Sequence, residues 1–189
     1  MSQTPPSGEA PFSRYASVLR SGLFAGEVHW VTGGGSGIGR CVAHELAALG
    51  ATVILTGRTE EKLRRVADEI AQDGGRADIA AFDIRVEEVV QSAVHAMVAK
   101  HGRIHGLVNN AGGQFPAPLM AISKKGFETV LANNLTGGFL MMRELYLQSM
   151  QTHGGAIVNM TADMWNGMPG MGHSGAARAG MANLTKTAV

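Results

Sequence analysis

Short apolar runs alternate with longer amphipathic stretches along most of the chain. The short runs are rich in β-branched residues and predict strands. They lie near 28–32, 52–56, 77–82, 104–109 and 156–160. The stretches between them repeat apolar residues at helical spacing and predict helices. These lie near 37–49, 59–73, 86–101, 123–131, 134–152 and 174–189. This alternation is typical of βαβ units with right-handed crossovers, so we predict an α/β fold with a doubly wound parallel sheet.

Both ends of the chain lie outside this regular alternation. Residues 1–25 predict a polar tail followed by an arm that folds back onto the domain. This arm is expected to carry Tyr15, Leu19, Leu23 and Phe24 back onto the domain. The domain itself is expected to span residues 26–189. Because no strands follow the last helix, we expect a sheet that is incomplete at its C-terminal edge, with the outer side of the fifth strand exposed.

Composition narrows the class of protein. With 189 residues, 45% hydrophobic and 16% charged, the chain can bury the core of one domain. The net charge of +1 offers no general field for nucleic acid or an anionic membrane. The single cysteine cannot form an internal disulfide, and neither an 18-residue apolar run nor a secretory signal is present. We therefore expect a cytoplasmic protein, and we assign no metal-binding residues.

A glycine-rich loop, TGGGSGIGR at 32–40, follows the first predicted strand and opens the first helix. In this context the loop is expected to aim backbone N–H groups and the positive end of the helix at a pyrophosphate. Gly33 permits the turn, Gly37 the close approach of phosphate, and Gly39 tight packing of helix on strand. The cofactor-binding residues that we assign to this loop are Gly33, Ser36, Gly37, Ile38 and Gly39.

The end of the second strand indicates which dinucleotide is bound. A carboxylate here would hold the ribose hydroxyls of NAD, but the chain has Gly57 and Arg58. Gly57 leaves room, and Arg58 offers a fork of donors to a 2′-phosphate, which favours NADP(H). The alternative is that Arg58 is a solvated surface residue. After the third strand, Asp83 is expected to bind the adenine amino group and Ile84 to cover its ring; alternatively, Asp83 caps the helix that begins near Val86.

Four motifs at compatible spacings carry a family resemblance. They are TGxxxGxG at 32–39, NNAG at 109–112, NLTG at 134–137 and IVN at 157–159. With them, residues 26–189 resemble the short-chain dehydrogenases/reductases, which implies a Rossmann fold. The resemblance also implies that Asn110, Ala111 and Gly112 line the cofactor and that Asn134 belongs to the catalytic hydrogen-bond network. From the residue alone, Asn134 can equally bond neighbouring backbone.

The chain departs from the family at the catalytic positions. The family's Tyr-x-x-x-Lys pair falls on Ser174 and Arg178, and its serine falls on Thr161 or Ala162. A narrower resemblance accounts for these departures. The segments NNAGGQF at 109–115, LTG at 135–137, HGG at 153–155 and HSGAARAG at 173–180 are similar to the peroxisomal trans-2-enoyl-CoA reductases and their bacterial relatives. The neighbouring 2,4-dienoyl-CoA reductases also carry a serine in the tyrosine position.

These residues suit one kind of reduction better than another. A serine hydroxyl is too weak an acid to protonate an alkoxide, and the arginine keeps its charge. Reduction of an enoyl thioester gives an enolate, which Ser174 and Asn134 are expected to stabilise while Arg178 holds the nicotinamide ribose. The α-carbon then needs a proton from Asp163, from His173 or from a water that they hold. Asp163 is favoured by position if the loop buries it, and His173 by its ordinary pKa. Their alternative interpretations are an exposed loop carboxylate and a helix-start residue.

Three functions follow from the sequence. The first is an NADPH-dependent enoyl-thioester reductase, and the second is a carbonyl or alcohol dehydrogenase acting on 3-oxoacyl or terpenoid substrates. The third is an NADP-binding protein or fragment without turnover. Methionines at 160, 164, 168 and 171 predict either a channel for an acyl or terpenoid chain or simple core filling. The resemblance further implies a homo-oligomer, dimer or tetramer, in which the helix at 139–145 packs on a second subunit rather than only on its own sheet.

Overall fold

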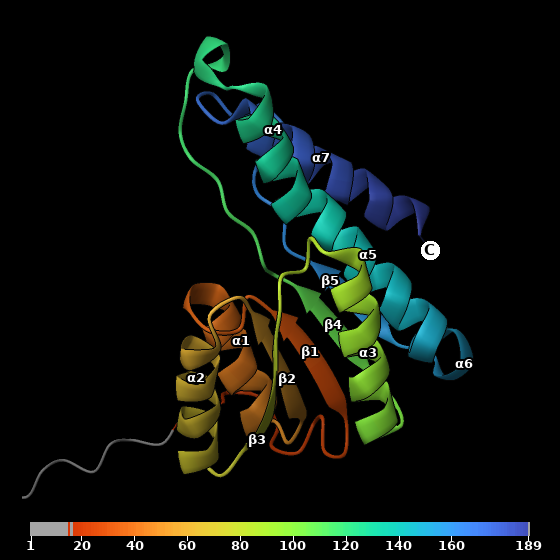
Figure 1. Cartoon of the computed structure of the whole chain (residues 1–189). Coiled ribbons are helices and arrows are strands. Elements are labelled where there is room, and N and C mark those ends of the chain that lie inside the picture. The colour runs from red at the N-terminus through yellow and green to blue at the C-terminus, as the bar shows by residue number, and fades with distance from the viewer. Residues whose placement is uncertain (1–14, 16, 189) are drawn as a thin grey trace, which may run out of the picture.

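A five-stranded parallel sheet forms the centre of the computed structural model, which describes residue 15 and residues 17–188 (Figure 1). The strands are β1 (Val28–Thr32), β2 (Thr52–Gly57), β3 (Arg76–Ala81), β4 (Gly106–Asn109) and β5 (Ala156–Asn159). Their order is β3-β2-β1-β4-β5, and every neighbouring pair is parallel. The chain progresses outward from β1 on one side and from β4 on the other. This confirms the predicted doubly wound α/β fold, with its switch point between β1 and β4.

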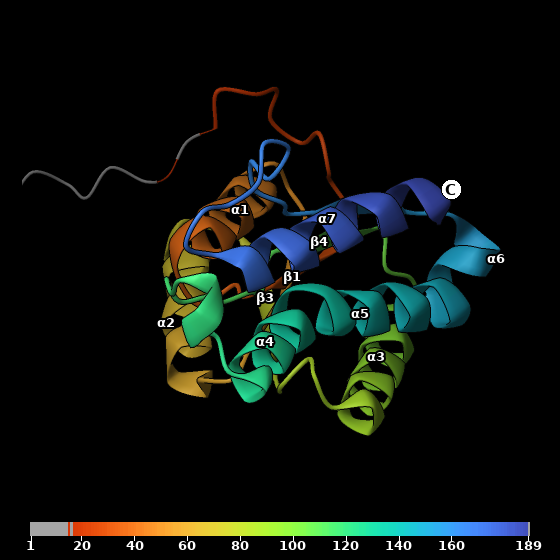
Figure 2. The ribbon, with the colours of Figure 1, turned by 90° about the horizontal axis from the view of Figure 1, so that it is seen from above.

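Helices cover both faces of the sheet and bury a separate apolar cluster against each. On one face lie α1 (Gly37–Ala48) and α2 (Glu60–Gln72), whose buried residues meet Val31, Val53 and Leu55. On the other lie α3 (Glu87–His101), α5 (Gly137–Leu145) and α7 (Gly172–Thr187). Figure 2 shows α1 and α2 gathered apart from α3 and α5. Because β1 is buried along its whole length, both clusters meet at the strand that leads into the glycine loop.

The helix before β5 is longer than the sequence indicated. It begins as α4 (Lys124–Leu131) and continues through a π-turn (Ala132–Thr136), α5, a second π-turn (Tyr146–Met150) and α6 (Gln151–His153). The expected break at 132–133 is wrong, because each π-turn accommodates an extra residue without interrupting the helix. A 3-10 turn (Leu119–Ala121) precedes α4, and α7 runs alongside α4 (Figure 1).

The arm before β1 contacts the domain through polar and apolar residues. The Tyr15 hydroxyl donates a hydrogen bond to Glu45 on α1, and Phe24 packs against the α1–α2 cluster. Leu19 and Leu23, expected to fold back as well, are 53% and 42% exposed. Residues 1–14 and 16 of the predicted tail and arm lie outside the described residues.

The fifth strand forms one edge of the sheet, and β3 forms the opposite edge. Within the described chain β5 pairs with β4 alone, and Val158 is 55% exposed.

Candidate active site

The loops after β1 and β4 are joined by hydrogen bonds at the carboxyl end of the sheet. The buried Thr32 hydroxyl accepts from the backbone N–H groups of Asn110 and Ala111, both at 3.0 Å. In return, the Asn110 side-chain amide donates to the Thr32 carbonyl at 3.0 Å. This bracing fixes the crevice between two neighbouring parallel strands, which is where nucleotides bind in sheets of this kind. We had not assigned Thr32 to the site, although it begins the glycine motif.

The glycine loop has the shape expected of a phosphate cradle. Gly33 adopts φ +69°, a left-handed conformation that favours glycine. A Cβ on Gly39 would collide with the Gly33 carbonyl and the Asn110 amide, so only glycine lets α1 approach the strand ends. Ser36 is the N-cap of α1 and its side chain makes no capping bond. The first N–H groups of α1 are therefore free of a side-chain cap and suit an anion.

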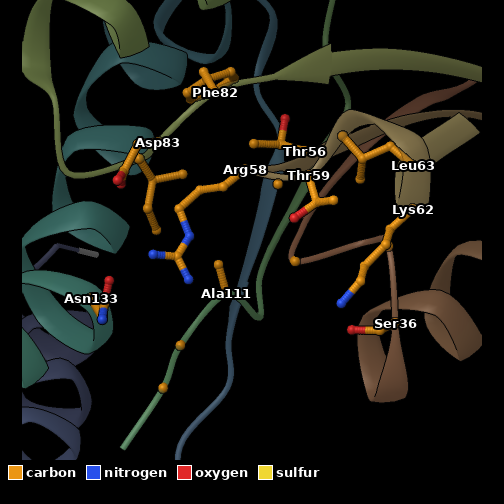
Figure 3. Close-up of a pocket in the computed structure, with 16 residues that line it drawn as sticks. Ser36, Thr56, Arg58, Thr59, Lys62, Leu63, Phe82, Asp83, Ala111 and Asn133 are labelled. Atoms are coloured by element: carbon orange, nitrogen blue, oxygen red, sulfur yellow. The ribbon is translucent and has the colours of Figure 1, made fainter.

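A pocket of approximately 240 Å³ opens beside this loop, between the ends of β2 and β3 (Figure 3). The residues assigned to the cofactor from sequence that line it are Gly33, Ser36, Arg58, Asp83, Ile84, Ala111 and Gly112. Figure 3 shows the exposed Arg58 side chain reaching into the pocket between Asp83 and Asn133. Lys62, in the first turns of α2, also lines the pocket and points toward Ser36. Lys62 follows Arg58 by four residues, and this spacing could have indicated a second cation at the same site.

Asp83 is held in place by its neighbour. Its carboxylate accepts from the backbone N–H of Arg85 at 3.0 Å and from the Arg85 guanidinium at 2.5–3.0 Å. These bonds to Arg85 hold the pKa of Asp83 below its usual range. Helix α3 begins at Glu87 with Val86 as its N-cap and has no side-chain cap bond, so the alternative that Asp83 caps this helix is wrong.

A second pocket of approximately 270 Å³ lies between the loops that follow β4 and β5, next to Arg178 of α7. Its lining comprises Ile38, Asn110, Gly112, Gly113, Gln114, Met160, Thr161 and Arg178. Of the two candidates for the position of the family's serine, Thr161 lines this pocket and Ala162 does not. Gly112 and Gly113 line both pockets, and Asn110 lines this one; that Asn110, Ala111 and Gly112 bind the cofactor stays a prediction.

Ser174 and Arg178 lie one helical turn apart on α7. The fully buried Ser174 hydroxyl donates to the side-chain oxygen of Gln114, a residue to which we had assigned no role. Arg178 donates through Nη1 to the Met160 carbonyl at 2.5 Å, while its buried Nε has no partner among the described residues. Burial lowers the pKa of Arg178 without removing its charge. A partly desolvated cation thus faces the pocket.

Asn134 bonds the backbone of the site loop. From the first π-turn its Nδ2 donates to the carbonyls of Gly113, at 2.7 Å, and Val130, at 2.8 Å. Its Oδ1 accepts from the Gly113 N–H at 3.3 Å. The residue lines neither of the two pockets. The geometry therefore matches the interpretation in which Asn134 orients backbone, and its catalytic role stays a prediction.

The two candidate acids are not brought to the pocket. Asp163 is exposed, so the expectation that its loop buries it is wrong. His173 is fully buried, its Nδ1 accepts from the Ser174 N–H at 2.9 Å, and its ring meets Phe115 edge-on at 4.5 Å. Because Nδ1 accepts, it carries no proton in this arrangement. Among the methionines, Met160 lines the pocket, Met164 is buried, and Met168 and Met171 are half-buried.

Comparison with known proteins identifies this arrangement. The sequence model of the family described as short chain dehydrogenase matches residues 27–189. The chain belongs to the short-chain dehydrogenase/reductase family. Its members are oxidoreductases that bind nicotinamide cofactors. Mouse peroxisomal 2,4-dienoyl-CoA reductase, from the branch neighbouring the one expected, is 33% identical over 190 residues, covering 98% of this chain and 65% of that protein.

Two solved structures share the fold closely. One, the citronellol catabolism dehydrogenase (AtuB) of Pseudomonas aeruginosa PAO1, is 63% identical with a TM-score of 0.89, covering 92% of this chain and 72% of that one. A metagenomic short-chain oxidoreductase in complex with NADP is 33% identical with a TM-score of 0.83, covering 88% and 76%. The chain spans 58–66% of the length of the curated relatives that it matches. Within the described residues, no helix is long and apolar enough to cross a bilayer.

Proposed function

We propose that this chain works in an NADP(H)-dependent reductase that acts on a carbon–carbon double bond conjugated to an acyl thioester. The observation that carries the proposal is the buried Ser174 hydroxyl, bonded to Gln114 and followed one turn later by Arg178. This set can donate hydrogen bonds to an oxyanion, but it cannot readily deliver a proton to an alkoxide. The naming of the mouse relative as a dienoyl-CoA reductase supports this class of substrate.

The cradle fits a phosphorylated dinucleotide. Glycine at position 39 and the uncapped start of α1 leave room and N–H donors for the pyrophosphate. Arg58 and Lys62 place two cations in the adenosine-side pocket, where a 2′-phosphate would make charge-assisted bonds. Arg178, whose Nε has no partner in the part of the chain that the structure describes, is the residue that we assign to the nicotinamide ribose. The related structure solved with NADP is consistent with this choice of cofactor.

The bound cofactor supplies a hydride, and the chain's own residues deal with the resulting charge and proton. Ser174 and Thr161 can direct hydroxyl donors at the thioester oxygen once the Gln114 amide turns its nitrogen toward Ser174. Each such donor contributes about 3–4 kcal/mol to transition-state stability. Asn134 keeps the Gly113 loop in place. The proton for the α-carbon is proposed to come from Asp163 or a water that it holds, after the loop has moved inward.

A second candidate is a terpenoid alcohol or carbonyl dehydrogenase. It is favoured by the 63% identity to the protein described as a citronellol catabolism dehydrogenase. The lack of a phenol beside Arg178 in the pocket lining argues against it. A thioester with a branched acyl chain would fit the donors of the site and would also agree with the terpenoid named in the description of that relative.

We also propose, from the family resemblance, that the protein is a homo-oligomer, either a dimer or a tetramer. Exposed apolar side chains on the long helix support it, since Phe139, Tyr146 and Leu147 are 39%, 52% and 56% exposed. Cytoplasmic localisation, and the absence of nucleic-acid and membrane partners, stay predictions from composition.

The decisive experiment follows NADPH absorbance with a trans-2-enoyl-CoA, a 2,4-dienoyl-CoA, a 3-oxoacyl-CoA and citronellal. We expect turnover of the thioester alkenes, and Ser174→Ala should lower their kcat by about 10²–10³. Asn183→Ala, an exposed change farther along α7, should leave kcat unchanged. Reduction of the oxo compounds alone would favour the dehydrogenase. NADPH binding without any turnover would favour the third function inferred from sequence.

A further inference from the structure

The two loops that continue from the pocket-lining residues Gln114 and Thr161 carry large apolar side chains that are exposed or half-buried. In the loop after β4, Leu119 is 79% and Met120 94% exposed, and Phe115 is 41% exposed. In the loop after β5, Met168 and Met171 are half-buried. We call these five residues the apolar rim. Exposing large apolar side chains together costs free energy unless another apolar group covers them. Such a surface therefore indicates a binding site for an apolar group.

The two loops form one surface. The backbone N–H of Ala117 donates to the Gly170 carbonyl at 2.7 Å. Leu119 lies next to the first residue of α7, Gly172, with 3.7 Å between its Cδ1 and a Cβ placed there. In Figure 1 the 3-10 turn that carries Leu119 and Met120 is the unlabelled green coil before α4, near the start of α7. Met168 packs beside Gly175 in the first turn of that helix.

This surface begins next to the reactive hydroxyl. Gln114 and Ser174 are bonded to each other, and the residues adjacent to them in sequence, Phe115 and His173, meet edge-on with their rings 4.5 Å apart. The polar pair and the aromatic pair are therefore neighbouring contacts between the same two segments. If the polar group of a ligand lies at Ser174, the first residue of the rim, Phe115, is the sequence neighbour of Gln114, which bonds Ser174.

We propose that the apolar rim binds the hydrocarbon tail of the acyl substrate and selects medium or long chains, straight or branched, over short ones. The inference rests on the proposed function, which puts the thioester carbonyl at Ser174. The continuity of the rim with the polar pair favours a substrate tail over a bilayer. Lys124 and Lys125, which follow the 3-10 turn, are exposed cations that suit the phosphates of a CoA ester.

The test measures binding rather than turnover. Butyryl-CoA and decanoyl-CoA are titrated calorimetrically into the protein with saturating NADP⁺. The double variant Leu119→Ser/Met120→Ser removes the exposed part of the rim, and Val18→Ser, a fully exposed site on the arm, is the matched control. We expect decanoyl-CoA to bind at least about tenfold more tightly than butyryl-CoA, from the apolar area of the extra methylenes. The double variant should lose most of that preference and leave butyryl-CoA affinity unchanged, and Val18→Ser should change neither.

Several results would overturn the inference. They are a chain-length preference that survives the double substitution, an equal loss for both esters, and no binding of either ester. Loss of sedimentation with phosphatidylcholine/phosphatidylglycerol vesicles, with unchanged ester binding, would assign the rim to a membrane instead. If the preference is present and responds to the substitutions, but no alkene thioester is turned over, the rim stands and the proposed function fails.

Discussion

At the residue scale, cofactor choice depends on the side chains at the carboxyl end of β2. Arg58 lies where a carboxylate would hold an unphosphorylated ribose, and its exposed guanidinium has no hydrogen bond or ion pair within the described residues. Asp83, on the opposite wall, is already paired with Arg85. Arg58 is thus the side chain in that wall that is available for a 2′-phosphate, and Lys62 adds to the positive potential.

Replacing Arg58 tests this assignment. Arg58→Asp should weaken NADPH binding by about tenfold to a hundredfold, because a charge-assisted bond is lost and a like charge is introduced. NADH binding should change little. Fluorescence titration of both nucleotides measures the difference, with Arg64→Asp, an exposed α2 residue outside the pocket lining, as the control. An equal loss for both nucleotides would reject the 2′-phosphate assignment.

The residue-scale predictions that succeeded depend on local sequence. Gly33 and Gly39 were predictable because the constraint on each is set by a turn and by the motif around it. The exposure of Asp163 was not predictable, since it depends on how far its loop folds over the sheet. The same holds for Gln114, whose partner Ser174 lies sixty residues later.

At the element scale, the first π-turn connects the long helix to the site loop. It lets Asn134 point toward Gly113 while α4 and α5 continue on either side. π-turns inside helices often mark functional sites because the widened turn redirects a side chain. The pattern of apolar residues predicted both flanking helices but placed a break between them. Periodicity reports which face is buried, and it contains no signal for one extra residue within a turn.

Asn134→Ala should loosen that connection. It removes two donated bonds and leaves the Gly113 carbonyl and the buried Val130 carbonyl without this partner, so we expect a loss of about 1–3 kcal/mol in the free energy of unfolding. Cofactor affinity should fall as well, because Gly113 lines both pockets. Urea unfolding and nucleotide titration measure the two effects, and Asn183→Ala on the exposed side of α7 serves as the control. A stable variant with normal affinity would show that Asn134 does not position the loop.

At the scale of the whole molecule, sequence reasoning predicted the parallel sheet and the crevice, because strand–loop–helix order determines both. The attachment of the arm was harder to predict, since it depends on contacts distant in sequence. Tyr15 and Ser17 both donate to the Glu45 carboxylate, and the Tyr15 ring lies 5.7 Å from that of His44. One carboxylate on α1 therefore carries the polar attachment of this end of the arm.

That carboxylate makes the attachment dependent on pH. The hydrogen bonds from Ser17 and Tyr15 lower the pKa of Glu45, so its folded value lies below its unfolded value. The stability that it contributes is present above the unfolded pKa and is lost as pH falls through the folded value. Amide exchange at Leu19, whose N–H donates to Ser17, should therefore accelerate relative to its intrinsic rate as the solution is acidified below about pH 4.

Glu45→Gln separates this effect from general acid unfolding. The amide cannot take the negative charge, so the arm should be held more weakly at neutral pH, and trypsin should cleave after Arg20 about two- to fivefold faster. Exchange at Leu19 should then be fast at neutral pH and change little on acidification, while Phe24, whose N–H bonds the Leu49 carbonyl, stays protected in both proteins. If wild type and variant show the same pH profile at Leu19, the arm is held by its apolar contacts and not by Glu45. Cofactor affinity should be unchanged in the variant, because Glu45 lines neither pocket of the site.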